Sequence, residues 1–288
     1  MIFIHAAGIH NTMPRERQPD LAEELHTLTG KIYRRTDHFI QLAILGAHKA
    51  AGTRELPAQT AIYLTSGQGN ISVFTRICEQ RRQHNLLPKP VDFINLLSNS
   101  AGFYVASHLA LDGKNLFVTH HHFPAQMALL AAQNDLRLGR QKMVLLGGVD
   151  EWIPRQELAR KLLGVSPSTQ LGEGSNWLLL NSEEKNALAT VEVHPQLLSS
   201  SLLAALLSYA PRNTSLIFSH RFDREAVSGF MRRYPQCRLF SPEEDSGYYE
   251  THPLFTLSSF LRQEKGRLIH IDTDGNQYMI VTLANDLL

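Results

Sequence analysis

Short runs of apolar residues alternate along this chain of 288 residues with longer segments in which apolar residues recur every three or four positions. The short runs are typical of buried β-strands, and the longer segments are typical of helices that bury one side. Strands are predicted within residues 1–9, 60–67, 115–119, 176–181, 187–193 and 214–220, in a strand that ends at Gly147 and Gly148, and in a hairpin over 266–284. Helices are predicted within residues 35–52, 71–85, 98–113, 124–138, 197–210, 224–235 and 252–266. This alternation is expected of an α/β protein with a mostly parallel sheet.

The predicted elements form two series of similar βαβ content, which residues 152–171 link. Two such series predict an internal pseudo-repeat. We therefore expect an N-terminal half over residues 1–170 and a shortened C-terminal half over residues 171–288. A chain of this length is able to bury a sizeable core.

The composition is that of an ordinary globular protein, with 43% hydrophobic and 19% charged residues. A formal net charge of +1 leaves no electrostatic footprint for nucleic acid or an anionic membrane, so neither is expected as a partner. No stretch reaches the ~18 to 20 continuous apolar residues of a membrane span, and the first residues resemble a strand rather than a signal peptide. Cys78 and Cys237 lack the paired spacing of a disulfide or a zinc site, which favours a reducing compartment. We expect a soluble cytoplasmic protein.

Three consecutive histidines, His120, His121 and His122, lie between the predicted strand 115–119 and the predicted helix 124–138. At such an elbow, unpaired backbone N–H groups of the helix favour an anionic nucleophile or a developing oxyanion. A metal site needs ligands that converge on one point, whereas consecutive residues at a turn point in different directions. We therefore expect no metal and no cofactor. A structural role for the histidines and an unfamiliar catalytic role both remain open.

Several stretches occur in the order that they have in one known family. They are RRTDHFIQLAILGAHKA, LTSGQGN, LSNSAGFYVASHLALDGKNLFV, LLGGVDE and GEGSNWLLLNSEEKNA. Together they resemble the β-ketoacyl synthase branch of the thiolase-like condensing enzymes. This resemblance implies a thiolase-like layered α/β sandwich, in which two βαβ-type halves pack around buried helices, truncated relative to full-length ketosynthases.

The same resemblance places His122 where the family has its nucleophilic cysteine, which takes an acyl group from a carrier protein as a thioester. Neither cysteine of this chain falls at an equivalent position. His220 and His252 are the candidate counterparts of the family's two catalytic histidines. The glycines and threonines that normally follow the first, and the glycine that normally precedes the second, are missing here. The elbow therefore resembles a site that has lost its nucleophile.

A ketosynthase homologue without its cysteine resembles a chain length factor. This implies a subunit without activity of its own, which forms a heterodimer with a cysteine-bearing β-ketoacyl synthase and meets an acyl carrier protein only indirectly. The setting would be fatty acid or polyketide-type biosynthesis. A narrower resemblance is to the ketosynthase-like subunits of aryl polyene pigment clusters. The alternatives are a stand-alone acyl-thioester decarboxylase or hydrolase that uses His122 with His220 or His252, and a purely structural homodimer.

The resemblance also places the interface of the heterodimer within Ser98 to Val118. Small residues on the predicted helix permit close approach, and the strand that follows is an apolar edge that favours pairing. The expected interface residues are Ser100, Gly102, Phe103, Ala106, Leu109, Asn115 and Phe117. The residues expected to shape an acyl pocket are Phe103, Tyr104, His122 and Phe123.

Overall fold

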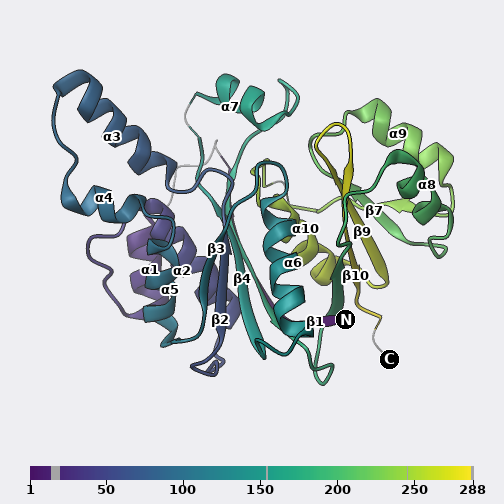
Figure 1. Ribbon diagram of the computed structural model, residues 1–288, viewed down its shortest axis with the longest axis horizontal. Coiled ribbons are helices and arrows are strands. Elements are labelled where there is room, and N and C mark those ends of the chain that lie inside the picture. Colours follow the sequence, from purple (N-terminus) through teal and green to yellow (C-terminus); the bar gives the residue numbers. More distant parts are fainter. Residues whose placement is uncertain (14–19, 154, 245, 287–288) are drawn as a thin grey trace.

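The computed structural model describes residues 1–13, 20–153, 155–244 and 246–286 (Figure 1). The strands are β1 (Ile2–Thr12), β2 (Ala61–Thr65), β3 (Asn115–Val118), β4 (Met143–Asp150), β5 (Glu173–Asn181), β6 (Ala189–Val193), β7 (Ser215–Phe218), β8 (Arg238–Leu239), β9 (Arg267–Thr273) and β10 (Tyr278–Ala284). The helices are α1 (Leu21–Thr29), α2 (His38–Ala51), α3 (Ile71–His84), α4 (Pro90–Leu96), α5 (Ser100–Leu109), α6 (Pro124–Arg137), α7 (Gln156–Leu163), α8 (Ser200–Ser208), α9 (Arg224–Arg233) and α10 (His252–Gln263).

These strands form one ten-stranded sheet in the order β3-β2-β4-β5-β1-β6-β10-β9-β7-β8. Five pairings are antiparallel and four are parallel. The expectation of a mostly parallel sheet is therefore wrong. The reason lies at the centre, where β1 runs antiparallel to both β5 and β6, and in the hairpin of β9 and β10.

The strand order repeats within the sheet. Read from one edge, the first five strands follow the order β3-β2-β4-β5-β1, and read from the other edge the last five follow β8-β7-β9-β10-β6. Each of the strands β1 to β5 corresponds to the strand whose number is five higher, so that β1 corresponds to β6 and β3 to β8. Corresponding neighbours pair in the same parallel or antiparallel sense. The fold thus contains the predicted internal repeat. The first repeat of the sheet extends to Asn181, and the division of the chain at residue 170 stays a prediction.

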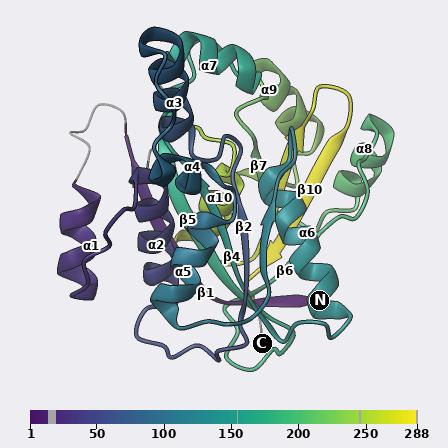
Figure 2. The same cartoon turned by 60° about the vertical axis from the view of Figure 1, so that its left-hand side comes forward.

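The two halves of the sheet face each other across α6 and α10 (Figure 1). One apolar core fills this middle layer. It includes Phe123, the N-cap residue of α6, Leu129 of α6, and Leu254 and Phe260 of α10. A second core lies between the first half of the sheet and α2 and α5, and a third lies between the second half and α8 and α9. Helix α1 packs outside α2 (Figure 2). The predicted layers with buried central helices are confirmed.

Helix α2 illustrates how the local sequence builds this packing. The side chain of Asp37 accepts the backbone N–H of Ile40 and caps the helix, and Gly52 ends it. Any side chain at Gly46 would overlap Ser175 and Trp177 of β5, so a glycine is needed where the helix lies directly on the strand. Within the described residues, no helix is long and apolar enough to cross a membrane.

Candidate functional site

The elbow that leads into α6 holds its own backbone donors in place. Phe123 is the N-cap residue, and Pro124 occupies the first turn. The Nδ1 atom of His120 accepts the backbone N–H of His122 at 3.2 Å and that of Phe123 at 3.1 Å. Desolvation lowers the pKa of His120, which favours the neutral ring that is able to accept these bonds. Donors that would stabilise an oxyanion at this elbow are therefore engaged by an imidazole.

His122 is half-buried, and its ring lies against His121 and Phe123, with centroid separations of 4.3 and 6.0 Å. Desolvation, followed by the neighbouring His121 and Arg221, lowers the pKa of His122. The fully buried side chain at the start of the helix is the phenyl ring of Phe123, which belongs to the core between the two halves of the sheet. The side chain of the elbow that faces inward is therefore an apolar phenyl ring.

Arg221, which no sequence pattern singled out, connects this elbow to the second half of the molecule. Its guanidinium is almost fully buried, and Nη1 donates to the backbone oxygen of His122 at 2.8 Å and to Oδ1 of Asp272 at 3.1 Å. Its Nη2 lies 3.7 Å from Oε1 of Glu250. One cation thus joins the elbow, the end of β9 and the loop before α10.

Further buried polar groups complete the network on the carboxylate side. Gln126 of α6 donates to Oδ2 of Asp272 at 2.8 Å, and Gln68 donates to Oε2 of Glu250 at 2.8 Å. Burial, together with the charge of Asp150, raises the pKa of Glu250 to about 7. Asp150 at the end of β4 accepts from the hydroxyl of Ser66 and from the backbone N–H of Gly67 and Thr251.

This network occupies the space beside the elbow. A side chain at Gly67, just after β2, would overlap Glu250. Ion pairs of this depth are costly to break because each partner would be left buried without compensation. The arrangement therefore fixes the loops in place, and it contains no thiol.

His220 and His252 lie side by side. Their ring centroids are 4.8 Å apart and the rings are nearly perpendicular. His252 is buried, with Nε2 3.1 Å from the hydroxyl of Ser246 and Nδ1 3.3 Å from that of Thr256. Burial lowers the pKa of His252 well below its usual value, so its ring is neutral. His220 is exposed, and its ring lies tilted against that of Tyr248, with a centroid separation of 5.0 Å.

The four residues expected to shape a pocket do not form one group in this chain. Phe103 is 65% exposed on α5, and Tyr104 packs edge-on against it at 5.6 Å. Helix α5 covers the outer face of the sheet, whereas Phe123 lies in the middle layer. The sheet separates the first pair from Phe123 and its neighbour His122.

The expected interface residues lie at one edge of the molecule, because β3 is the first strand of the sheet. Asn115 and Phe103 are exposed. Gly102 is buried, and any side chain there would meet Asn115 of the same chain, so its small size serves the packing of α5 on β3. Of the remaining expected interface residues, Ser100 is buried, and Ala106, Leu109 and Phe117 are half-buried.

Within the described residues, no group of three or more His, Cys, Asp or Glu side chains is arranged so that it could hold a metal ion. That the protein works without a metal stays a prediction. Cys78 and Cys237 are free, and neither lies at the elbow.

No protein-family model and no curated protein sequence matches the chain. Solved structures do match along its whole length. The ishigamide ketosynthase/chain length factor has a TM-score of 0.74 at 15% identity, with 99% of each chain covered. A β-ketoacyl synthase from Burkholderia phymatum has a TM-score of 0.66 at 12% identity, again with 99% of each chain covered. A ketosynthase in complex with its chain length factor from Xenorhabdus doucetiae has a TM-score of 0.57 at 13% identity, with 98% of each covered.

These likenesses establish the fold. The chain has the thiolase-like architecture of ketosynthases and chain length factors, as the sequence motifs implied. Two of these three structures, those of the ishigamide and the Xenorhabdus doucetiae proteins, are named as a ketosynthase together with a chain length factor.

Proposed function

We propose that this protein is a non-catalytic, chain-length-factor-type subunit that pairs with a cysteine-bearing β-ketoacyl synthase. The observation that carries the proposal is the composition of the elbow. His120 engages the backbone donors, Phe123 fills the inward position, and the Arg221 ion network occupies the space beside them. Acyl transfer needs a nucleophile beside free oxyanion donors. This elbow holds no thiol, and His120 already engages two of its backbone donors.

The rival reading, an acyl-thioester hydrolase or decarboxylase that uses His122, has weaker support. A general base needs a free nitrogen within hydrogen-bond reach of the substrate. Both ring nitrogens of His252 have hydroxyl partners, so this histidine does not meet the requirement. The subunit reading requires none of these groups to react.

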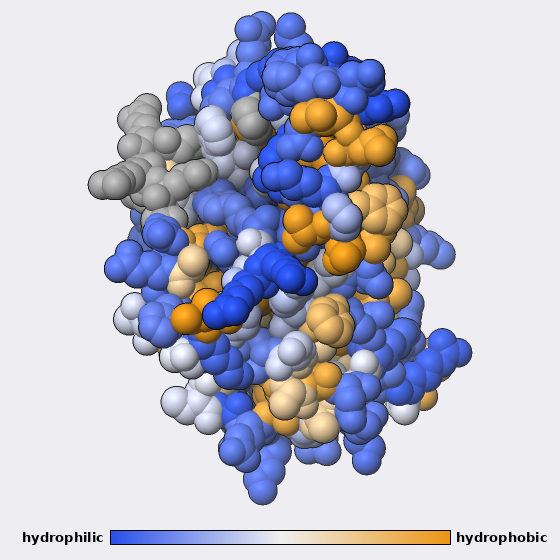
Figure 3. All heavy atoms as spheres, turned by 90° about the vertical axis from the view of Figure 1, so that its left-hand side faces the viewer, coloured by the Kyte–Doolittle hydropathy of each residue, from blue (hydrophilic) through white to orange (hydrophobic). Residues whose placement is uncertain are grey.

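The surface around β3 supports a large partner. The face that carries α1 to α5 shows a band of hydrophobic residues (Figure 3). The exposed apolar side chains on α3, α4, α5 and the connections between them are Phe74, Leu86, Leu87, Phe93, Ile94, Leu97 and Phe103. Exposed apolar surface beside an unpaired strand edge marks an interaction site. Obligate interfaces of this kind commonly bury more than ~2,000 Å².

The partner would supply the reaction, and this chain would complete and stabilise the partner's pocket. We place the pair in fatty acid or polyketide-type biosynthesis, with an aryl polyene as the product class. Acyl carrier protein would meet this chain only through the partner. A cytoplasmic location agrees with the two free cysteines.

The proposal is tested by incubating the co-purified pair with an acyl carrier protein that bears a labelled acyl group. Intact-protein mass spectrometry should detect the acyl adduct on the partner and none on this chain. The partner with its nucleophilic cysteine replaced by alanine is the control, and it should lose the adduct. A stable acyl adduct on this chain would overturn the proposal.

A further inference from the structure

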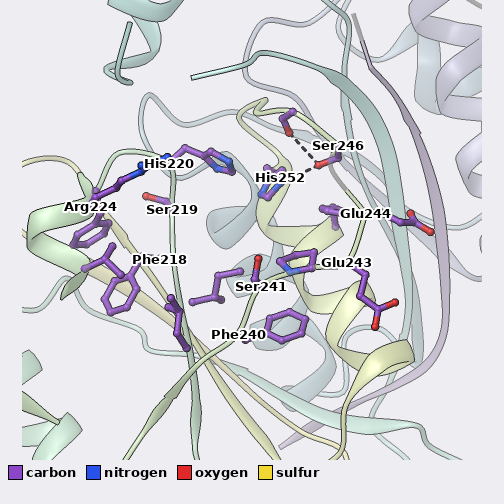
Figure 4. A pocket seen from close by; sticks show the side chains of 17 residues that line it. Phe218, Ser219, His220, Arg224, Phe240, Ser241, Glu243, Glu244, Ser246 and His252 are labelled. Carbon is purple, nitrogen blue, oxygen red and sulfur yellow. Dashed lines mark hydrogen bonds between the residues drawn. The ribbon is translucent and has the colours of Figure 1, made fainter. Parts of the chain in front are cut away.

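A cavity of about 520 Å³ opens at the carboxyl ends of β7 and β8 (Figure 4). The two strands are parallel neighbours. The helices that follow them lie on opposite faces of the sheet, since α9 packs in the outer core with α8, and α10 packs in the middle layer with α6. Crevices at such a reversal of strand order are the usual ligand sites of open α/β sheets. The volume of this cavity falls in the range of small-molecule pockets.

Four phenylalanines are among the residues that line the cavity. They come from four elements or connections, with Phe218 at the end of β7, Phe222 before α9, Phe240 after β8 and Phe255 on α10. Phe218 and Phe222 are T-shaped neighbours at 5.2 Å, which is a favourable edge arrangement. Rings at several orientations favour a flat aromatic or conjugated ligand, because they offer both faces and edges to its π-system.

The polar end of the cavity is formed by His220 and His252, and the hydroxyl of Ser241 points into the cavity from the β8 side (Figure 4). An imidazole and a hydroxyl are each able to donate to, or accept from, a ligand oxygen. Burial keeps His252 neutral, so this end carries no fixed cation in the interior. A hydroxyl or carbonyl group therefore matches it better than a charged group.

The charges at the rim act against an anionic ligand. Glu243 and Glu244 line the rim with Arg224, so two carboxylates oppose one guanidinium. The low-dielectric wall between them and the interior strengthens this effect. A carboxylate would enter against a net negative rim and would find no buried cation at the end.

We propose that this cavity is a binding site for a neutral aromatic or conjugated molecule, with its flat body among the phenylalanines and one hydroxyl or carbonyl oxygen facing Ser241 and His220. The inference goes beyond the subunit proposal and does not depend on it, because the cavity lies within one half of one chain.

The probe is 2-naphthol, measured by isothermal titration calorimetry against the full-length protein. Its dissociation constant should lie below about 1 mM, given the size of the ligand. Two comparison compounds sharpen the chemistry. The anionic 2-naphthoate and the saturated decahydro-2-naphthol should each bind about tenfold more weakly.

Variants locate the site without disturbing the core. Ser241→Trp fills the cavity from an exposed position and should weaken 2-naphthol by at least about tenfold, whereas Ser208→Trp, at an equally exposed serine of α8, should leave it unchanged. His220→Ala should weaken it about fivefold through the lost polar contact. Circular dichroism checks that each variant is folded. Equal binding to wild type and Ser241→Trp, or tighter binding of 2-naphthoate than of 2-naphthol, would overturn the proposal.

Discussion

The two edges of the sheet hold equivalent positions in the repeat but differ in what they expose. Strand β3 has four residues, of which three are half-buried, and it is flanked by the exposed apolar side chains of α3 to α5. Strand β8 has two residues, both exposed. Very short edge strands discourage pairing with another chain, whereas longer apolar edges favour it. The comparison supports our proposal that the partner binds at the first half of the sheet rather than at the second.

The crevices beside these two edges also differ: the one in the first half is filled by side chains, and the one in the second half is open. In the first half, the space at the ends of β2 and β3 is occupied by Arg221 and Glu250, which belong to the second half. In the second half, the equivalent space between β7 and β8 is the open cavity. A repeated backbone thus carries two different chemistries, because side chains from one repeat fill the crevice of the other.

The largest effect on this arrangement is expected from Arg221→Leu. The change leaves Asp272 and Glu250 buried without their cation, which should cost about 3–5 kcal/mol of unfolding free energy. Urea denaturation followed by circular dichroism measures it. Arg212→Leu, at an exposed arginine, is the matched control and should change stability by less than about 0.5 kcal/mol. Similar losses in both variants would show that the network does not hold the two halves together.

A smaller, pH-dependent effect is expected from Glu250→Gln. The pKa of Glu250 is about 7 in the folded protein, above the usual value of 4.5, so the folded state binds the proton more tightly than the unfolded state. The contribution of Glu250 to the stability of the wild type should therefore fall as the pH rises from 4.5 to 7, by an amount on the order of 1–3 kcal/mol.

The glutamine variant lacks this titration. Its stability relative to the wild type should increase across the same pH range, as measured by urea denaturation at fixed ionic strength. A relative stability that stays constant or declines with rising pH would contradict the raised pKa of Glu250.

The smallest effect is expected from His122→Cys, which should not produce a ketosynthase. The new thiol would still lie beside donors that His120 engages and beside the phenyl ring of Phe123. Oxyanion geometry tolerates little error. Ketosynthase turnover by purified variant and wild type should both be undetectable. Turnover by the single variant would show that the site is more intact than its contacts indicate.

Regular elements with a strong hydrophobic period could be predicted from the sequence, and those without one could not. Helix α2 and the hairpin of β9 and β10 were found because their buried residues recur at the expected spacing. Helix α4 was missed because two of its apolar residues, Phe93 and Ile94, face outward. Strand β8 was missed because its two exposed residues form no apolar run.

The candidate site shows the same limit in its chemistry. His220 and His252 were each singled out by the residues around them, and their rings are in contact in the structure. The Arg221 network was not singled out, because its partners Glu250 and Asp272 lie far away in the sequence and no motif joins them. A charged residue at or shortly after the end of a buried strand, as Asp272 in HIDTD and Arg221 in SHRFD, is the signal that could have revealed it.

The measurement that tests the central claim most directly is assembly with a ketosynthase. The protein is co-expressed with a cysteine-bearing β-ketoacyl synthase from the same organism, and the complex is examined by size-exclusion chromatography with light scattering. Phe103→Glu places a charge on the proposed interface, and Leu202→Glu places one at a similarly exposed leucine of α8. The account predicts a 1:1 complex for the wild type and Leu202→Glu, and at least about tenfold weaker assembly for Phe103→Glu. The absence of a complex in the wild type, or an intact complex with Phe103→Glu, would contradict it.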